Sequence, residues 1–137
     1  MQAVDWMLSN SPNRSLIERK VLADCVDACA ACGLTCTSCA DACDGETEHL
    51  EALRRCVRLN LDCAAICFAT ASVLSRQFSP DKNIFRVQVE ACEVACAACA
   101  AECERHAEAH EHCRVCAQIC RRCEEQCRRV SRQFNAA

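Results

Sequence analysis

Small apolar residues, most of them cysteine, recur along this chain at alternating steps of three and four positions. That alternation places side chains on one stripe of a helix, the stripe that faces the core of a helical bundle. Cysteine therefore occupies positions that leucine or isoleucine usually fills. The stripe cysteines are Cys25, Cys29, Cys32, Cys36, Cys39, Cys43, Cys56, Cys63, Cys67, Cys92, Cys96, Cys99, Cys103, Cys113, Cys116, Cys120, Cys123 and Cys127.

Few residues interrupt the periodic segments, since Gly and Pro occur only twice each. So few turn residues argue against a loop-rich or all-β fold. We expect helices over about 14–43, 46–77, 80–106 and 111–134, with a Ser15–Glu18 capping box before the first and Pro80 in the first turn of the third. Four long helices with short connections predict an all-α, antiparallel four-helix bundle over residues 13–137. Residues 1–12 form a separate N-terminal segment with a short extra helix over 3–9.

The stripes are apolar rather than thiol-bearing where the first and third helices begin and the second and fourth end. In an up-down-up-down bundle these segments meet at one end. We predict a closed apolar end that keeps the metal-free bundle folded, and a thiol-lined half that opens toward the turns at 44–46 and 104–112. The apolar end is expected to contain Leu16, Ile17, Val21, Leu22, Val73, Leu74, Phe78, Ile84, Phe85, Val87, Val89, Val130 and Phe134.

Charge and the N-terminus limit the partners and the compartment. The net charge of −3 gives no reason to expect nucleic acid or an anionic membrane as partner. No uninterrupted apolar run approaches the roughly 18 residues of a membrane helix, and no export signal precedes the first helix. We therefore expect a cytoplasmic protein with reduced thiols. No nucleophile, base and orienting group share a spacing that suggests an enzyme.

Three roles for the sulfur atoms compete. Packing as a small hydrophobic residue explains one or two buried cysteines but not 18 oxidisable groups. Disulfides require Cβ atoms about 3.5–4.5 Å apart, closer than the roughly 5–6 Å between positions i and i+4 of a helix. A two-coordinate metal ion bridges sulfurs roughly 4.3 Å apart, which such pairs reach without distorting the helix. Eight cysteine pairs are separated by four positions, so metal binding is favoured.

Ligand softness and charge favour Cu(I) as the metal. Almost pure thiolate suits Cu(I) best, whereas zinc requires four converging ligands and iron–sulfur centres usually show compact sets of four cysteines. If each thiolate bridges two ions and each ion takes two thiolates, one Cu(I) per cysteine neutralises the core, or about 18 ions. Two alternatives stay open: a general thiolate detoxifier for zinc or cadmium, and an electron-transfer protein with an iron–sulfur or copper cluster.

Four further side chains are candidates at or near the stripe. His106 and His110 continue the stripe beyond Cys103, and His49 lies seven positions before Cys56, also in register. These histidines are either an uptake port that hands ions to the first thiolates or solvated turn residues. Asn60 fills the step at which the second helix lacks a cysteine, as a weak ligand or as a hydrogen-bonding core residue. His112 lies off the stripe.

The ladder of C-x-x-x-C and C-x-x-C spacings on four helices, with Asn60 in the gap after Cys56, resembles the bacterial copper storage proteins. The resemblance covers about residues 14–134, and the lack of an export signal together with the histidines makes the chain similar to the cytosolic type. It implies a four-helix bundle filled with Cu(I), a homotetramer that holds copper safely in the cytosol, and no catalytic turnover. Copper ions, and copper chaperones or efflux proteins that exchange them, are the expected partners.

Overall fold

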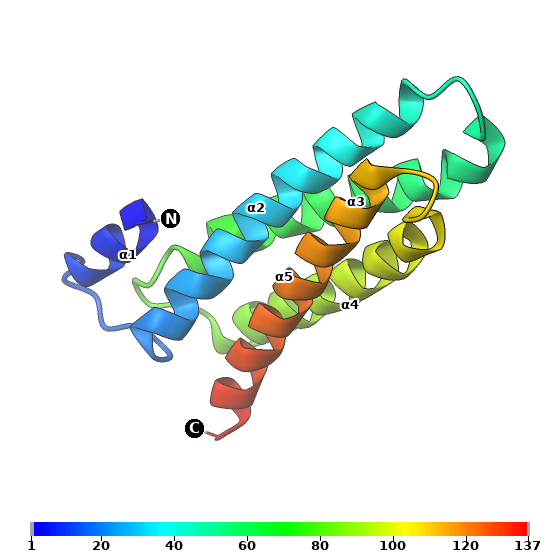
Figure 1. The fold of residues 1–137 in the computed structure, drawn as a ribbon. Helices are drawn as coiled ribbons and strands as arrows, with labels where there is room; N and C mark the ends of the chain where they lie inside the picture. Colours follow the sequence, from blue (N-terminus) through cyan, green and yellow to red (C-terminus); the bar gives the residue numbers. More distant parts are fainter. Residues whose placement is uncertain (1, 137) are drawn as a thin grey trace.

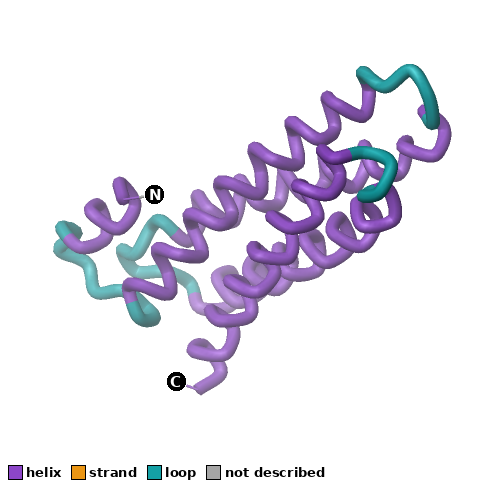
Figure 2. Tube along the Cα trace, in the orientation of Figure 1, coloured by secondary structure: helices purple, strands orange, loops and turns teal. Residues whose placement is uncertain are grey.

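The computed structural model describes residues 2–136, and every regular element in this range is a helix. A short helix, α1 (Gln2–Ser9), precedes four long ones: α2 (Arg19–Asp44), α3 (Leu50–Leu74), α4 (Lys82–His106) and α5 (Glu111–Ala136). The long helices lie side by side with short loops between them, and each runs opposite to the one before it (Figures 1 and 2). Helix α2 packs against α3 and α5, and α4 packs against the same two helices. The predicted bundle with a short N-terminal helix is confirmed.

The starts of α2 and α4 differ from the prediction because other contacts define them. Glu18 precedes α2 in an extended conformation and its side chain caps nothing, so the predicted Ser15–Glu18 capping box is wrong. Instead, the backbone N–H groups of Leu16 and Glu18 donate to the side-chain oxygens of Gln77 and Gln133. These tertiary hydrogen bonds hold the segment outside the helix.

Helix α4 begins after Pro80 rather than with it. The Asp81 carboxylate accepts hydrogen bonds from the backbone N–H groups of Asn83 and Ile84, at 2.9 and 3.0 Å. This is the geometry of an N-cap residue. Aspartate is a strong N-cap, so the helix starts at Lys82, two residues later than the predicted start at Pro80, and Pro80 lies before the cap.

Helix α3 is shorter than predicted at both ends. It spans residues 50–74 rather than 46–77, and His49 caps it in the left-handed conformation, with φ of 64°. The chain therefore turns through residues 45–49 before α3 begins. This loop and the α4–α5 connection lie at the same end of the bundle, which we call the open end (Figure 1).

The opposite end of the bundle is apolar, but it contains fewer residues than the sequence suggests. Phe78, Ile84 and Val87 are exposed, so their predicted place in this end is wrong. Phe78 follows the end of α3, and Ile84 and Val87 lie off the face of α4 that Phe85 shares with residues 89 and 92. We define the apolar end by its fully buried side chains: Leu22, Leu74, Phe85, Val89 and Val130.

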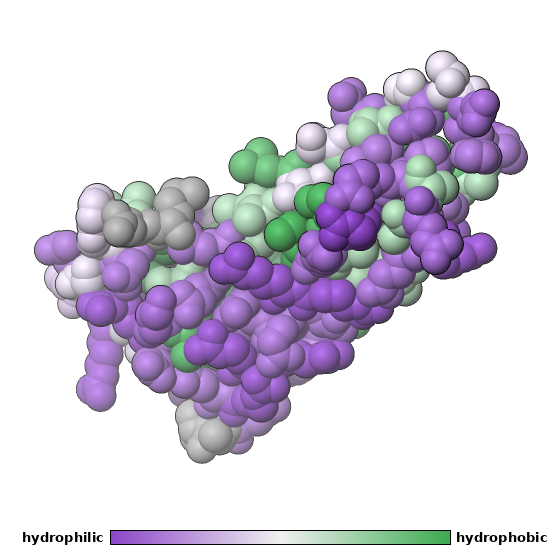
Figure 3. All heavy atoms as spheres, in the orientation of Figure 1, coloured by the Kyte–Doolittle hydropathy of each residue, from purple (hydrophilic) through white to green (hydrophobic). Residues whose placement is uncertain are grey.

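Helices α2 and α3 are each long and apolar enough to cross a membrane, by length and composition alone. Their many cysteines and alanines contribute to this apolar character. Core helices of globular proteins share these properties, and 56% of the most apolar segment of α2 is buried inside the bundle. The face in Figure 3 is mostly hydrophilic, with apolar residues gathered along the middle of α2.

Candidate metal-binding core

All 18 cysteines point into the bundle as free thiols. Every one is buried, and the most exposed, Cys39, has only 2% of its surface accessible. The helical stripe therefore predicts the direction of these side chains correctly. No disulfide joins them, so the full set of sulfur atoms is free to bind metal.

The sulfur atoms meet both along and across the helices. Within a helix, the Sγ atoms of Cys63 and Cys67 are 3.8 Å apart, as the four-residue spacing predicts. Across helices, the Sγ atoms of Cys36 and Cys120 are 3.5 Å apart. The interhelical contacts were not deducible from spacing, because the register between two helices is a tertiary property.

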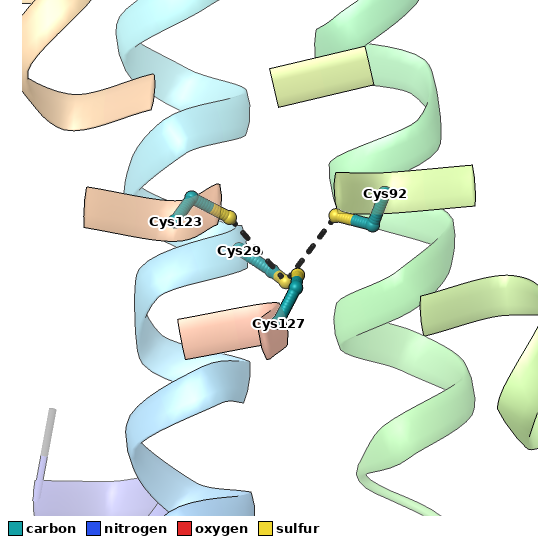
Figure 4. Close-up of side chains that lie close together, drawn as sticks. All are labelled: Cys29, Cys92, Cys123 and Cys127. Atoms are coloured by element: carbon teal, nitrogen blue, oxygen red, sulfur yellow. Dashed lines mark hydrogen bonds between the residues drawn. The ribbon is translucent and has the colours of Figure 1, made fainter. Parts of the chain in front are cut away.

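Groups of four sulfurs arise where these contacts converge. Figure 4 shows one of them: Cys29 of α2 lies between Cys92 of α4 and Cys123 of α5, at 3.7 Å from each sulfur, with Cys127 beside it. The ligand atoms of each group lie within 4.8 Å of one another. Similar groups are Cys32, Cys63, Cys67 and Cys96; Cys32, Cys36, Cys63 and Cys120; and Cys36, Cys99, Cys116 and Cys120. Cys32 and Cys63 are shared by the first two of these three groups, and Cys36 and Cys120 by the last two, so the three groups are continuous. A contact of 3.8 Å between the Sγ atoms of Cys67 and Cys92 links them to the group in Figure 4.

Burial keeps the thiol of Cys43, near the open end, protonated without metal. Loss of solvent, reinforced by the nearby Cys56, raises the pKa of Cys43 to about 11. A thiol with this pKa is neutral at physiological pH and behaves as a small apolar group. A metal ion must therefore displace a proton to bind it.

Asn60 is fully buried among the thiols and forms hydrogen bonds with several of them. Its Oδ1 accepts from the Sγ atoms of Cys99 and Cys116, at 3.0 and 3.3 Å, and its Nδ2 donates to Cys56 at 3.6 Å. Of the two roles considered for Asn60, the structure displays the hydrogen-bonding one. Its amide links thiols of three helices.

The functional side chain that sequence reasoning missed is His112. Its Nδ1 lies 3.6 Å from the Sγ atoms of Cys39 and Cys113 and 3.9 Å from that of Cys43. Together these four residues form a mixed nitrogen and sulfur group. His112 does not belong to the cysteine stripe of α5. It contacts the thiols because it lies in the first turn of this helix, where its side chain reaches over the end of the bundle. Its position next to Cys113 is the one sequence signal that could have identified it.

Two of the predicted histidines join His112 at the open end. The ring centroid of His110 lies 5.5 Å from that of His49 and 5.5 Å from that of His112. These rings and Glu46 line a cleft of about 300 Å³. The hydrogen bond with His112 is the main cause that lowers the pKa of Glu46, so this carboxylate is ionised beside the imidazoles.

His106 has a different environment. Its Nε2 lies 2.9 Å from Oε2 of Glu102, a buried carboxylate on the preceding turn of α4, which Arg105 also contacts. The structure thus separates His106 from the cleft that contains His49, His110 and His112. Its place on the extended stripe alone did not reveal this.

A helical bundle filled with free thiols, with imidazoles over its open end, has the features of a store for soft metal ions. A family model described as copper storage protein matches residues 18–132. The chain belongs to the copper storage protein family, a family of non-enzymatic metal stores, which confirms both the resemblance and the prediction that it is not an enzyme. No curated protein sequence gave a significant match.

Solved structures of the copper storage protein Ccsp from Streptomyces lividans are similar along nearly the whole chain. The structure loaded with 10 copper equivalents is 44% identical with a TM-score of 0.92, and the match covers 95% of this chain and 98% of that one. A structure of the cytosolic copper storage protein with five coppers is 47% identical with a TM-score of 0.80, over 82% and 93% of the two chains. A variant with one histidine replaced by alanine is 45% identical with a TM-score of 0.84, over 86% and 98%.

Proposed function

We propose that this chain stores Cu(I) in the cytosol, with a capacity of about one ion per cysteine, or about 18 ions. The observation that carries the proposal is the continuous array of free, buried thiols along the bundle. Family membership supports copper as the cargo, and the Streptomyces relative loaded with 10 copper equivalents supports a capacity of many ions. The relative described as cytosolic supports the location.

Charge distinguishes Cu(I) from zinc in such a core. One Cu⁺ per thiolate leaves the interior neutral. A zinc ion held by four thiolates leaves two negative charges without compensation, and buried charges without partners are costly. No lysine or arginine is buried in the part of the chain that the structure describes, so none is available inside to balance them. A neutral copper-filled core is therefore favoured over zinc or cadmium.

The sulfur spacing suits shared copper ions. A copper–sulfur bond is slightly shorter than the 2.3 Å of zinc, so three sulfurs around one ion lie about 3.9 Å apart. Thiol contacts in the core run from 3.5 Å for Cys36 and Cys120 to 4.0 Å for Cys25 and Cys127. Three-coordinate ions fit this spacing directly, and two-coordinate ions need the sulfurs to separate by a few tenths of an ångström.

The ligands we propose are all 18 cysteines together with His112, whose Nδ1 faces three sulfurs. His49 and His110 in the cleft, and His106 beside it along α4, would pass incoming ions to these first thiolates. Asn60 would contribute at most a weak oxygen ligand, because an amide oxygen is a hard donor for a soft ion. Copper chaperones or efflux proteins would exchange ions at the open end.

The assembly we propose is a homotetramer, as the family resemblance implies. Large apolar side chains remain exposed on α2 and α3, including Leu34, Leu61 and Phe68. Contiguous exposed apolar surface commonly marks a protein–protein interface. Analytical ultracentrifugation of the reduced protein tests this assembly, and a monomer at micromolar concentration would contradict it.

Anaerobic titration of the reduced protein with Cu(I) against a chromogenic chelator tests the function. We expect about 18 tightly held ions per chain, and about two fewer in a Cys36→Ser/Cys120→Ser variant. A parallel titration with Zn²⁺ should saturate at far fewer ions. Saturation at one to four coppers would indicate a cluster protein, and equal capacity for zinc would indicate a general detoxifier.

A further inference from the structure

A residue of the α2–α3 loop contacts two of the three histidines of the cleft. Oε1 of Glu46 lies 3.1 Å from Nε2 of His112 and 3.5 Å from Nδ1 of His110. One carboxylate oxygen therefore contacts two imidazoles: Nε2 of His112 and Nδ1 of His110. An ionised carboxylate only accepts hydrogen bonds, so both contacting nitrogens must carry a proton.

A neutral imidazole protonated on one nitrogen has a lone pair on the other. For His112 the lone pair is then on Nδ1, the atom that faces the sulfurs of Cys39, Cys43 and Cys113. For His110 it is on Nε2. This atom is buried and has no hydrogen-bond partner among the residues that the structure describes, and the residue as a whole is only 7% exposed. A buried nitrogen acceptor without a partner is costly in a folded protein and suits a ligand that arrives later.

We infer that Glu46 is a positioning residue for copper uptake: it fixes the tautomers of His110 and His112 so that both offer an unprotonated nitrogen to incoming Cu(I). The inference rests on the proposed function for its biological meaning, but the tautomers themselves are a property of the metal-free protein. Carboxylates that hold metal-binding histidines in this way commonly matter for binding, since their removal typically costs about 10–100-fold in affinity or activity.

Glu46 also links the α2–α3 loop to the start of α5. It follows the end of α2 by two residues, whereas His110 and His112 flank the start of α5. The histidines thus depend on a residue more than 60 positions away for their orientation. Glu108, in the α4–α5 connection, is exposed, carries the same charge and is not among the residues that line the cleft, which makes it a matched control.

The first measurement is long-range ¹H–¹⁵N NMR of the histidine side chains in reduced, metal-free protein, at a pH about two units above the usual histidine pKa. We expect His112 protonated on Nε2 and His110 on Nδ1. In Glu46→Ala, His110 should lose its preference for the Nδ1–H form. Glu46→Gln keeps a carbonyl acceptor and should retain part of this preference, and Glu108→Ala should match the wild type. Circular dichroism checks that each variant is folded.

The second measurement is stopped-flow uptake of substoichiometric Cu(I) from a chelated donor. We expect about tenfold slower uptake in Glu46→Ala, an intermediate rate in Glu46→Gln and no change in Glu108→Ala, with the final capacity the same in all. Wild-type tautomers and rates in Glu46→Ala would overturn the inference. A wild-type protein that binds only a few ions would refute the storage function instead, and the NMR result would still decide the role of Glu46.

Discussion

Phe85→Ala tests whether the apolar end, rather than metal, keeps the bundle folded. Phe85 is 1% exposed and stacks on Phe134 with ring centroids 5.6 Å apart. Replacing such a buried phenylalanine with alanine typically costs about 3–5 kcal/mol, because apolar contacts are lost and a cavity remains. That is a large part of the roughly 5–15 kcal/mol that stabilises a typical domain. The variant should be folded but markedly less stable.

Urea and thermal unfolding of the reduced, metal-free protein, followed by circular dichroism, measure the loss. For a chain of this size the melting temperature should fall by about 10–20 °C. Copper loading should more than offset the loss, because ions that bind only the folded state add to its stability. The loaded variant should therefore melt above the metal-free wild type.

Phe78→Ala is the matched control. Phe78 is 83% exposed, so the same substitution there should change stability by no more than about 0.5 kcal/mol. Equal effects of the two substitutions would show that the apolar end does not stabilise the bundle. A metal-free wild type that is mostly coil would refute the reasoning more directly, because copper would then be needed for folding itself.

Three further predictions concern the thiol core and its open end. Loading should release about one proton per Cu(I) at neutral pH, since burial raises the pKa of thiols such as Cys43, to about 11 there. A pH indicator in weak buffer measures this, and loading should weaken as the pH falls. Replacing His106 and His110 together by alanine should slow uptake from a chelated donor about tenfold with nearly unchanged capacity, and an unchanged rate would exclude the port. Asn60→Ala should lower the metal-free unfolding free energy by about 1–3 kcal/mol, since the thiols of Cys99 and Cys116 lose their acceptor. Urea unfolding measures this loss, and a stability equal to wild type would show that these hydrogen bonds contribute little.

The periodicity of the cysteines was enough to predict the helices and the direction of the thiols. Steps of three and four encode burial on one face, and burial of a face determines how helices pack. Cys25 and Cys127 illustrate the point: they lie at opposite ends of the sequence ladder, and their sulfurs meet at 4.0 Å in the core. Their pairing follows from the antiparallel arrangement of the first and last long helices.

Local signals failed where tertiary contacts define the structure. Ser15 and Glu18 have capping-box spacing, but the backbone there is hydrogen-bonded to glutamines of α5 and the segment after α3. Phe78 is apolar, yet the loop that contains it turns away from the core. His112 and Glu46 come together only because two loops meet at the open end. Periodicity describes helix faces, so it carries no information about residues beyond the helix ends.

The separation between the apolar end and the thiol array explains how one chain can both fold without metal and fill with it. Neutral thiols in contact at 3.5–4.0 Å pack as small apolar groups, so they add no buried charge to the metal-free bundle. Under the proposed function, each arriving Cu⁺ would replace a proton and join sulfurs of neighbouring helices, which would preserve neutrality and add a cross-link. Because Phe85, Val89 and Val130 are buried at the far end, ions that left through the open end would not remove the apolar contacts there. A store needs this property, and a domain that folds only around its metal lacks it.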